Sequence, residues 1–398
     1  MSGNDSRGDG SGDPPSGDSQ SSDSQSSDSQ PSDSQPSDSQ PGTVSGDPEP
    51  GSRTVNQSWF SRHRVLIAIA MVGTVLIATF GGWLVYLDSQ ISNVPRVALN
   101  LDEDRRPDRV TGEAEESLNI LLAGADAGKG PSIAQAVADG RWEPYSHRSD
   151  TIIVLHVTAD RDHAYLVSVP RDSFTKIDGI GKSKINAAFA VGGPSLYVKT
   201  LEDFTGLRMD HLAIIDWEGF RDLTKAIGGV PINIPEDVYD PSQKVQWEKG
   251  QQELEGELAL QYVRMRYGLE EGDFDRIKRQ QNFLRAFMKK MLSTGTTSNP
   301  IKLTNTVEAV VKYLTVDDEF DNGKIRSIAL SLRSLEEKDV TFITVPQERY
   351  ATIDGESVVI VDKDRTQELF AAVGNDDIES YIEEYGEEDV LGKQKTVN

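Results

Sequence analysis

Residues 65–87 form an apolar run of 23 residues, VLIAIAMVGTVLIATFGGWLVYL, without one charged side chain. A helix of this length extends about 34 Å at ~1.5 Å per residue, enough to cross the hydrocarbon core of a bilayer. A helix buried in a soluble core is the poorer interpretation, because no strongly polar residue gives the run a solvent face. The run therefore predicts one transmembrane helix.

The flanks of the run predict its orientation. Arginines at positions 53, 62 and 64 precede it, Asp88 follows it, and Trp83 and Tyr86 lie near its second end. The positive-inside rule then places the N-terminus in the cytoplasm and the domain after residue 87 outside the cell membrane, on a single-pass anchor. A cleaved signal peptide is disfavoured, because its apolar region is usually about 7–15 residues long and close to the N-terminus.

The segments on either side of the run have the composition of unfolded chain. Residues 1–64 begin with a stretch rich in Ser, Asp, Gly, Gln and Pro that repeats units such as SSDSQ and PSDSQ. Such a segment buries too little apolar surface to offset its chain entropy, so we predict a disordered cytoplasmic tail. Residues 88–117, which contain RRPDRV and EAEES, are predicted to form a polar stalk.

Charge and motif content exclude several functions. The net charge of −24 opposes nucleic-acid binding, and no DNA-reading motif is present. Cysteine is absent, which excludes disulfides, thiolate zinc sites and cysteine nucleophiles. The chain has no HExxH or GxSxG motif, and Ala123 and Lys176 occupy positions where a phosphate-binding loop would need glycine.

From Leu118 onward, short apolar runs alternate with helical patterns, as in a layered α/β domain. The predicted strands are 118–124, 151–157, 164–170, 212–217 and 230–234. The predicted helices are 184–191, 195–206, 217–229, 257–266 and 275–292. Three late segments, 341–347, 357–362 and 365–373, are expected to complete the same sheet. We predict an α/β fold over 118–374, with a mixed central sheet and helices on both faces in α-β-α layers, and an acidic solvated tail over 375–398.

Five polar segments adjoin the ends of these elements. They are GAD at 124–126, RSD at 148–150, PRD at 170–172, RMR at 264–266 and GDFDRIKRQ at 272–280. Ligands of α/β sheets bind at the carboxyl ends of strands, where Asp126, Arg171 and Asp172 are expected. Arg148 and Asp150 precede the strand predicted at 151–157, so this argument alone leaves them out.

The residue types in these segments suit a phosphate ligand. Arginine stays charged and donates a two-pronged set of hydrogen bonds to phosphate, and Arg276 and Gln280 lie four apart on one predicted helix face. Arg264 and Arg266 are about 200° apart on an ideal helix, so both reach one ligand only if the helix frays there, which the nearby Gly268 permits. Asp126 and Asp150 are hard oxygen ligands of the kind magnesium takes. The alternative for each residue singly is a surface salt bridge, and spacing does not exclude it.

Taken in order, seven segments resemble the LytR-CpsA-Psr family from about Leu118 to Leu292. They are LLAGAD, RSDTIIVLHV, VSVPRD, KINAAFAVGG, FRDLTKAIGGV, ALQYVRMR and GDFDRIKRQQ. The resemblance implies a phosphotransferase that moves a glycopolymer, such as teichoic acid, capsule or arabinogalactan, from polyprenyl pyrophosphate onto peptidoglycan, with Mg²⁺ or Mn²⁺ as cofactor. Ala127 and Gly128 depart from the family, which often has a charged residue shortly after the first aspartate.

The resemblance also implies roles for particular residues. Asp126 and Asp150 are expected to hold the metal ion, and Asp273 to orient arginines or assist proton transfer, with catalytic parts for Arg148, Arg171 and Arg276. The expected pyrophosphate-binding residues are Arg148, Arg171, Arg264, Arg266, Arg276 and Gln280. Lys184 and Asn186 are expected at the mouth of an apolar lipid tunnel lined by residues such as Phe189, Phe220 and Leu223, which packing in a core explains equally well.

Three other functions stay open at this stage. A pyrophosphate hydrolase would use the same site with water as the acceptor. A transcriptional attenuator would need a cytoplasmic domain that binds DNA, against the charge and the predicted topology. A lipid-binding scaffold would hold the polyprenyl chain without turnover.

Overall fold

The computed structural model describes residues 57–128, 130–265, 273–293, 299–332, 335–386 and 389–390, without the side chains of 57–72, 273–275 and 292. The chain divides into two units, Met1–Ile67 and Ala68–Asn398, and the second contains the α/β domain. Helix α1 (Gln57–Ile91) covers the apolar run, whose residues 65–72 lie outside those with described side chains. Among the residues that could be searched, no helix is long and apolar enough to cross a membrane.

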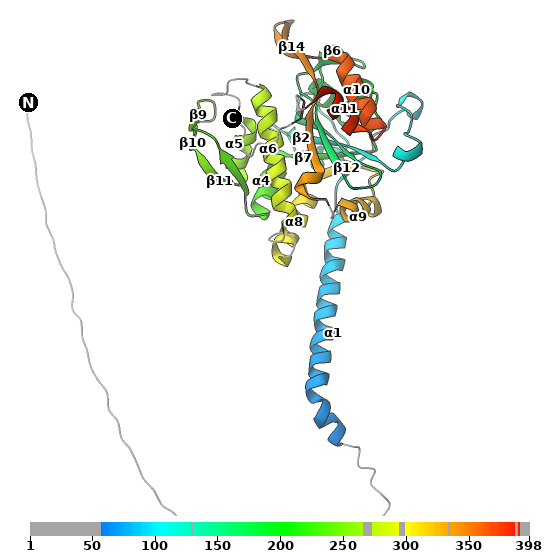
Figure 1. The fold of residues 1–398 in the computed structure, drawn as a ribbon, viewed down its shortest axis with the longest axis vertical. Coiled ribbons are helices and arrows are strands. Elements are labelled where there is room, and N and C mark those ends of the chain that lie inside the picture. Colours follow the sequence, from blue (N-terminus) through cyan, green and yellow to red (C-terminus); the bar gives the residue numbers. More distant parts are fainter. Residues whose placement is uncertain are drawn as a thin grey trace, which may run out of the picture. The chain divides into compact units, whose positions relative to one another are not determined.

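A seven-stranded mixed sheet forms the centre of the domain (Figure 1). Its strands, in spatial order, are β1 (Arg96–Val97), β12 (Leu314–Asp317), β7 (His211–Asp216), β2 (Leu118–Asp126), β3 (Arg148–Val157), β4 (Ala164–Ser168) and β13 (Val340–Thr344). Strand β2 runs parallel to β7 and antiparallel to β3. The predicted mixed sheet is therefore confirmed, with β2 and β3 at its centre.

In the described part of the chain, four two-stranded antiparallel sheets lie outside this sheet. They pair β5 (Phe174–Ile177) with β6 (Gly181–Lys184), β8 (Val230–Ile234) with β11 (Gly250–Leu254), β9 (Val238–Asp240) with β10 (Val245–Trp247), and β14 (Gln347–Ile353) with β15 (Glu356–Val361). Of the three late segments expected to complete the sheet, only 341–347 contributes a strand to it. The segment 357–362 pairs in a hairpin, and 365–373 is helical, since it carries Leu369, Phe370 and Val373 at helical spacing toward the core.

Helices pack on both faces of the sheet, as predicted for α-β-α layers. One face is covered by α2 (Ile133–Ala138), α3 (Asn186–Thr205), α10 (Lys363–Gly374) and α11 (Ile378–Tyr385). The other side carries α4 (Trp217–Ala226), α5 (Gly256–Arg264), α6 (Asp273–Leu292), α8 (Pro300–Tyr313) and α9 (Asn322–Ser331). Short 3₁₀ turns are η1 (Glu103–Arg105), η2 (Gly112–Ala114) and η4 (Glu337–Asp339).

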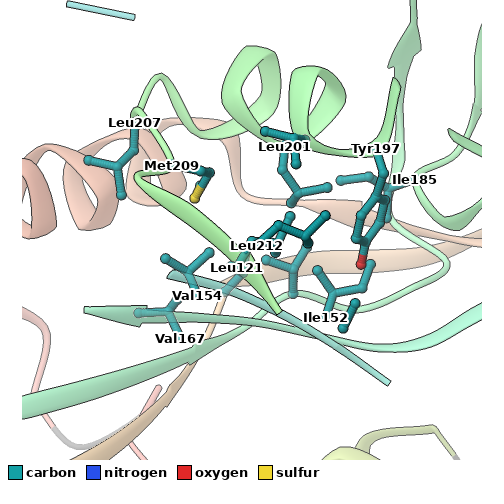
Figure 2. Close-up of a cluster of buried hydrophobic side chains, with 14 of the residues drawn as sticks. Leu121, Ile152, Val154, Val167, Ile185, Tyr197, Leu201, Leu207, Met209 and Leu212 are labelled. Atoms are coloured by element: carbon teal, nitrogen blue, oxygen red, sulfur yellow. The ribbon is translucent and has the colours of Figure 1, made fainter. Parts of the chain in front are cut away.

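Alternation along β2 divides its side chains between the two faces. Leu121 and Ala123 point into the cluster under α3, whereas Ile120 packs with Val311 of α8. Figure 2 shows Leu121 with Val154 and Val167 of the neighbouring strands, below Leu201 and Tyr197 of α3. This cluster is the main apolar core, and we call it the α3-face core.

Helix α3 joins the two helices predicted at 184–191 and 195–206. The break between them survives as a kink at Gly193, whose φ of 67° and ψ of −161° are not helical. A Cβ at Gly193 would lie 2.9 Å from the Trp142 ring, so glycine is required both by the backbone and by the neighbour.

Two segments expected to be solvated belong to the domain. Within the predicted stalk, Val94 is buried and Arg96–Val97 adds a strand beside β12. Within the predicted acidic tail, Ile378 and Tyr381 are buried in the α3-face core. Both predictions were wrong because each segment has few apolar residues, and these act only through contacts with distant parts of the chain.

Candidate functional site

The pairing of β2 with β3 creates the centre of the site. Because these strands are antiparallel, the carboxyl end of β2 lies beside the start of β3, and Asp126 pairs with Arg148. Strand β3 begins at Arg148 and not at Thr151, so Arg148 and Asp150 do not precede their strand. The prediction that Arg148 and Asp150 precede their strand was wrong. Residues 148–150 are polar, so a pattern of apolar residues does not indicate the true start of β3.

A β-bulge sets the direction of these side chains. Gly124 pairs with Thr151 and Ala125 with Ser149, which leaves Asp150 as the extra residue. Ser149 consequently turns toward the α3-face core, where its Oγ lies 2.9 Å from the Tyr197 hydroxyl. Asp126, Arg148 and Asp150 are thereby left at the opposite face.

Two ion pairs tie the aspartates to arginines. Arg171, which follows β4, donates from Nη1 to Asp150 Oδ1. Arg264, the last residue of α5, has its Nη2 3.9 Å from Asp126 Oδ2 and its guanidinium 5.7 Å from the centroid of the Trp217 ring. Both carboxylates therefore face positive charge, as expected where a metal-bridged or anionic ligand would be held.

Helices α5 and α6 supply the remaining arginine and amide. Helix α5 ends at Arg264 because Met265 is extended, so the helix is two residues shorter than the predicted 257–266. On α6, Arg276 is buried and Gln280 donates from Nε2 to the Val263 carbonyl at 3.2 Å. Arg279 faces away, with its guanidinium 5.4 Å from the Tyr262 ring centroid.

A cavity of about 490 Å³ brings these side chains together. The lining residues are Asp126, Arg148, Asp150, Arg171, Trp217, Ser242, Gln243, Arg264, Arg276 and Gln280. Seven of the predicted site residues are in this set, contributed by segments as far apart as β2 and α6. Four guanidinium groups and two carboxylates in one cavity suit a phosphate-containing ligand.

Three lining residues were missed by the sequence analysis: Trp217, Ser242 and Gln243. Asp240 fixes the last two, since its Oδ1 accepts from the Ser242 backbone N–H at 2.8 Å and its Oδ2 from Gln243 Nε2 at 2.9 Å. An aspartate with serine two positions later is a turn signature, and that signal was available from the sequence. This turn signature does not indicate a binding site, because only the tertiary fold places the turn at the cavity.

The β7–α4 junction supports the same region. Asp216 pairs with Ala125 in the parallel register of β7 and β2, and its Oδ1 caps α4 by accepting from the Gly219 backbone N–H at 2.7 Å. Burial raises the pKa of this carboxyl. The cap fixes the start of α4 and with it Trp217, the first residue of the helix.

The remaining predicted site residues either lie outside the described residues or are absent from the described lining of the cavity. Arg266 lies outside the described residues, as does the side chain of Asp273. Lys184 has its Nζ 3.6 Å from Asp172 and 3.4 Å from Glu356, and the Asn186 backbone N–H donates to the Arg171 carbonyl. Lys184 and Asn186 therefore contact the segment that contains Arg171 and Asp172.

The predicted tunnel lining is split between two clusters. Phe189 is fully buried in the α3-face core, edge-on to Trp142 and Tyr197. Phe220 packs against Phe283 in a separate cluster built on β8, β11, α5 and α6. Phe189 and Phe220 therefore do not line a common passage, and the core interpretation explains Phe189.

The carboxylates fit a hard divalent ion. Asp126 and Asp150 line the same cavity, and magnesium commonly takes one or two protein carboxylates and completes its shell with water and substrate phosphate. Among the described residues there is no group of three or more His, Cys, Asp or Glu side chains suited to a metal ion. At Gly128, φ is +55° and the backbone N–H donates to Asp126 Oδ1 at 2.8 Å, so the departure from the family at this position forms a tight turn onto the carboxylate.

The fold and the cavity define an α/β protein with an arginine-rich cavity, whose side chains suit a phosphate-containing ligand. The sequence matches the LytR_cpsA_psr family over residues 86–374. This chain belongs to that family.

Named relatives and a solved structure resemble the chain. It is 36% identical over 256 residues to the "Probable cell wall biosynthesis protein LcpB" of Corynebacterium glutamicum, covering 64% of this chain and 60% of that protein. It is 32% identical to the "Polyisoprenyl-teichoic acid--peptidoglycan teichoic acid transferase TagU" of Halalkalibacterium halodurans, covering 74% of this chain and 97% of the relative. The solved structure "TagT bound to LIIa-WTA" shares the fold, with a TM-score of 0.54, 24% identity and coverage of 71% of this chain and 98% of the other.

Proposed function

We propose that this chain is a membrane-anchored phosphotransferase that moves a glycopolymer from a polyprenyl pyrophosphate onto peptidoglycan in cell-wall assembly. The observation that carries the proposal is the single cavity in which four arginines face two carboxylates. Two relatives support the direction of transfer, because both are named as teichoic acid transferases acting on peptidoglycan. The particular glycopolymer and the acceptor sugar are left open.

In this proposal the arginines bind the pyrophosphate and neutralise its charge. Arg148 and Arg171 approach it from the sheet, and Arg264, Arg276 and Gln280 from α5 and α6. Arg266 is assigned the same role by the family pattern. Groups preorganised in this way stabilise charge that develops during transfer more effectively than water does, because they need no reorganisation.

The reaction is a substitution at phosphorus. A hydroxyl oxygen of the acceptor sugar forms a bond to the phosphorus that bears the glycan, and the bond from that phosphorus to the bridging oxygen breaks. Polyprenyl phosphate leaves with the bridging oxygen, and the hydroxyl proton passes to a carboxylate or to water. Asp273 is our candidate for orienting the arginines or receiving this proton. Such a step depends on positioning and charge, and it needs no covalent nucleophile on the protein.

Asp126 and Asp150 would hold a magnesium or manganese ion. When bound, the ion would neutralise charge on the phosphate oxygens. Asp150 is already oriented by Arg171, and Asp126 by the Gly128 backbone N–H. Both carboxylates are therefore held in position at the cavity.

We further propose that residues 65–87 anchor the chain, with the α/β domain outside the cell membrane and the N-terminus in the cytoplasm. The length and composition of the run support this, together with the arginines before it. A polyprenyl-linked substrate is confined to the membrane, so an anchored enzyme would meet it there.

The test is transfer by the full-length protein of a radiolabelled glycan from a synthetic polyprenyl pyrophosphate to purified peptidoglycan, with magnesium and with EDTA. Label should enter peptidoglycan with magnesium and not with EDTA. Arg264→Ala should lower the rate about 100-fold, a loss of ~2.7 kcal/mol of transition-state stabilisation. Arg221→Ala is the matched control, because Arg221 is similarly exposed but pairs with Glu257 on α5.

The outcomes separate the alternatives. Soluble glycan phosphate without labelled peptidoglycan would identify a hydrolase. An equal loss of transfer rate in Arg221→Ala and Arg264→Ala would show that the effect is not specific to the cavity and would contradict its proposed role. Retained lipid without any turnover would identify a binding protein.

A further inference from the structure

Two helices of the domain contact the outer end of α1 and run along it. On α8, Thr304 accepts a hydrogen bond from Trp83 Nε1 at 2.9 Å, and Glu308 accepts one from the Tyr86 hydroxyl at 2.6 Å. Moving from Trp83 to Tyr86 on α1 thus corresponds to moving from Thr304 to Glu308 on α8. The two helices are locally parallel, so the N-terminus of α8 points back along the apolar run.

Helix α9 runs the other way. Asn322 donates from Nδ2 to Ser92 Oγ at 2.8 Å, and Arg326 Nε lies 2.6 Å from Asp88 Oδ1. Moving toward the C-terminus of α9 therefore corresponds to moving toward the N-terminus of α1. The C-terminal end of α9 and the N-terminal end of α8 both extend from the outer end of α1 toward its apolar run.

Each of these ends carries a large exposed apolar side chain. Ile301 of α8 is 72% exposed, and Leu330 of α9 is 60% exposed. Ile301 lies three residues before Thr304, about 4.5 Å of helix rise, which brings it near the level of Phe80 on α1. Leu330 lies four residues after Arg326, about 6 Å, which brings it near the level of Leu84.

Charged side chains occur at the outer level on all three helices, and on α8 Lys302 also follows Ile301 in the first turn. Asp88, Glu308 and Arg326 lie at the outer level, together with the Trp83 and Tyr86 side chains that bind α8. Phe80 and Ile301 lie on the inner side of this level, and Leu84 and Leu330 lie between the levels of Trp83 and Tyr86. Tryptophan and tyrosine at such a boundary are typical of a membrane interface, where one part of the side chain is apolar and the other is hydrated.

The first turn of α8 also suits a surrounding poor in water. Asn299 Oδ1 accepts from the backbone N–H groups of Ile301 and Lys302 at 3.1 Å each, and Pro300 has no N–H. Two backbone N–H groups at the helix start are therefore satisfied by Asn299, and the position of Pro300 has no N–H that water would have to solvate.

We propose that the N-terminal turn of α8 and the C-terminal turn of α9 insert Ile301 and Leu330 into the outer leaflet of a phospholipid bilayer, at the boundary between headgroups and acyl chains. This inference rests on the proposed membrane anchor. The domain then contacts the membrane through three helices, α1, α8 and α9, and these three contacts fix its orientation relative to the membrane. A fixed orientation would hold the cavity at a constant height above the lipid that carries the substrate.

The absence of cysteine in the chain permits a direct test. Single cysteines are introduced in the full-length protein at Ile301, Leu330, Phe80 and Ile180, and each is labelled with the fluorophore NBD. The proteins are reconstituted in phosphatidylcholine and phosphatidylglycerol vesicles, with or without lipids that carry a nitroxide quencher near the headgroup. Ile180 is the matched control, since it is an exposed isoleucine in the β5–β6 turn on the side of the α3-face core.

The labels at 301 and 330 should lose at least half of their emission to the nitroxide lipids, and the label at 180 should lose none. Loss of emission from the label at position 80 without loss at 301 and 330 would overturn the inference but would still support the membrane anchor. No loss at position 80 would refute the anchor and the inference with it. Transfer to peptidoglycan, measured on the same vesicles, reports on the proposed activity separately.

Discussion

Arginines occur on both sides of the central sheet, and their surroundings differ. On the α3 face, Arg106 donates to both Glu202 oxygens and to the Met209 carbonyl, and Glu202 is 2% exposed. In the cavity on the other face, Arg171 pairs with Asp150 and Arg264 with Asp126, and Arg148 and Arg276 also border the same volume of about 490 Å³. The first arrangement is buried and stabilises the protein, whereas the second borders an open volume that an anion can enter.

The first prediction removes the buried arginine. Arg106→Ala leaves Glu202 as a buried carboxylate without its ion-pair partner, so the free energy of unfolding should fall by about 3–5 kcal/mol. Urea denaturation followed by circular dichroism measures this. Transfer activity of the folded fraction should stay near that of the wild type. A loss below 1 kcal/mol would mean that water replaces the guanidinium at Glu202.

The second prediction removes a cavity carboxylate and should have the opposite pattern. Asp126→Ala should lower transfer about 10²–10³-fold, or ~3–4 kcal/mol of transition-state stabilisation, because the proposed ion and Arg264 both lose their partner. The free energy of unfolding should change by less than about 1 kcal/mol, since Asp126 is partly exposed. Initial rates and denaturation of the same preparation provide the comparison. Full activity would exclude Asp126 from metal binding.

The third prediction concerns the β-bulge in β3, which turns Ser149 toward the α3-face core and leaves Asp150 at the cavity. Tyr197→Phe removes the hydroxyl that meets Ser149, which retains its contact to the Thr151 carbonyl at 3.2 Å. The loss should be about 1 kcal/mol in stability. If this hydrogen bond also holds Arg148 and Asp150 toward the cavity, transfer should fall several-fold at a temperature where the protein is fully folded. Unchanged transfer would show that strand pairing alone maintains the bulge.

The smallest effect is expected at Glu103, an exposed carboxylate that pairs with Arg106 and Arg208. Hydrogen bonds from Arg208 and Arg106 lower the pKa of Glu103 to about 2. Because this pKa lies below the unfolded value of about 4.3, the stabilisation is present above pH ~4.3 and is lost as the pH falls toward 2. The Glu103 side chain is 60% exposed, so Glu103→Gln should cost less than about 1 kcal/mol at pH 7 and nothing near pH 2. Stability curves of the two proteins against pH test this, and a constant difference would contradict the ion pairing.

The central strands and the residue types of the site could be predicted from local sequence. Apolar runs located β2, β3, β4 and β7, since a strand buried on both faces needs consecutive apolar residues. Polar segments beside strands and helices, together with the family resemblance, indicated seven of the cavity residues. Spacing on one helix also predicted that Arg276 and Gln280 face the same ligand.

Other features escaped prediction because they arise from pairing between distant segments. The β2–β3 register places Asp126 beside Arg148, and the bulge decides that Ser149 and not Asp150 faces the core. Ser242 and Gln243 reach the cavity through a hairpin turn, and the segments taken for stalk and tail enter the domain through Val94 and Ile378. None of these residues has a local pattern that distinguishes it from a surface residue.

The sequence by itself determined the apolar run, the layered α/β class and the chemistry of the site, because each depends on residue type and on periodicity along the chain. Only the tertiary structure decided which arginines are satisfied within the protein and which line a cavity. That distinction depends on strand register and on helix ends that meet across more than a hundred residues, as Asp126 and Arg264 do. Local propensity carries no information about such contacts, since their free energy appears only when the separate elements pack together.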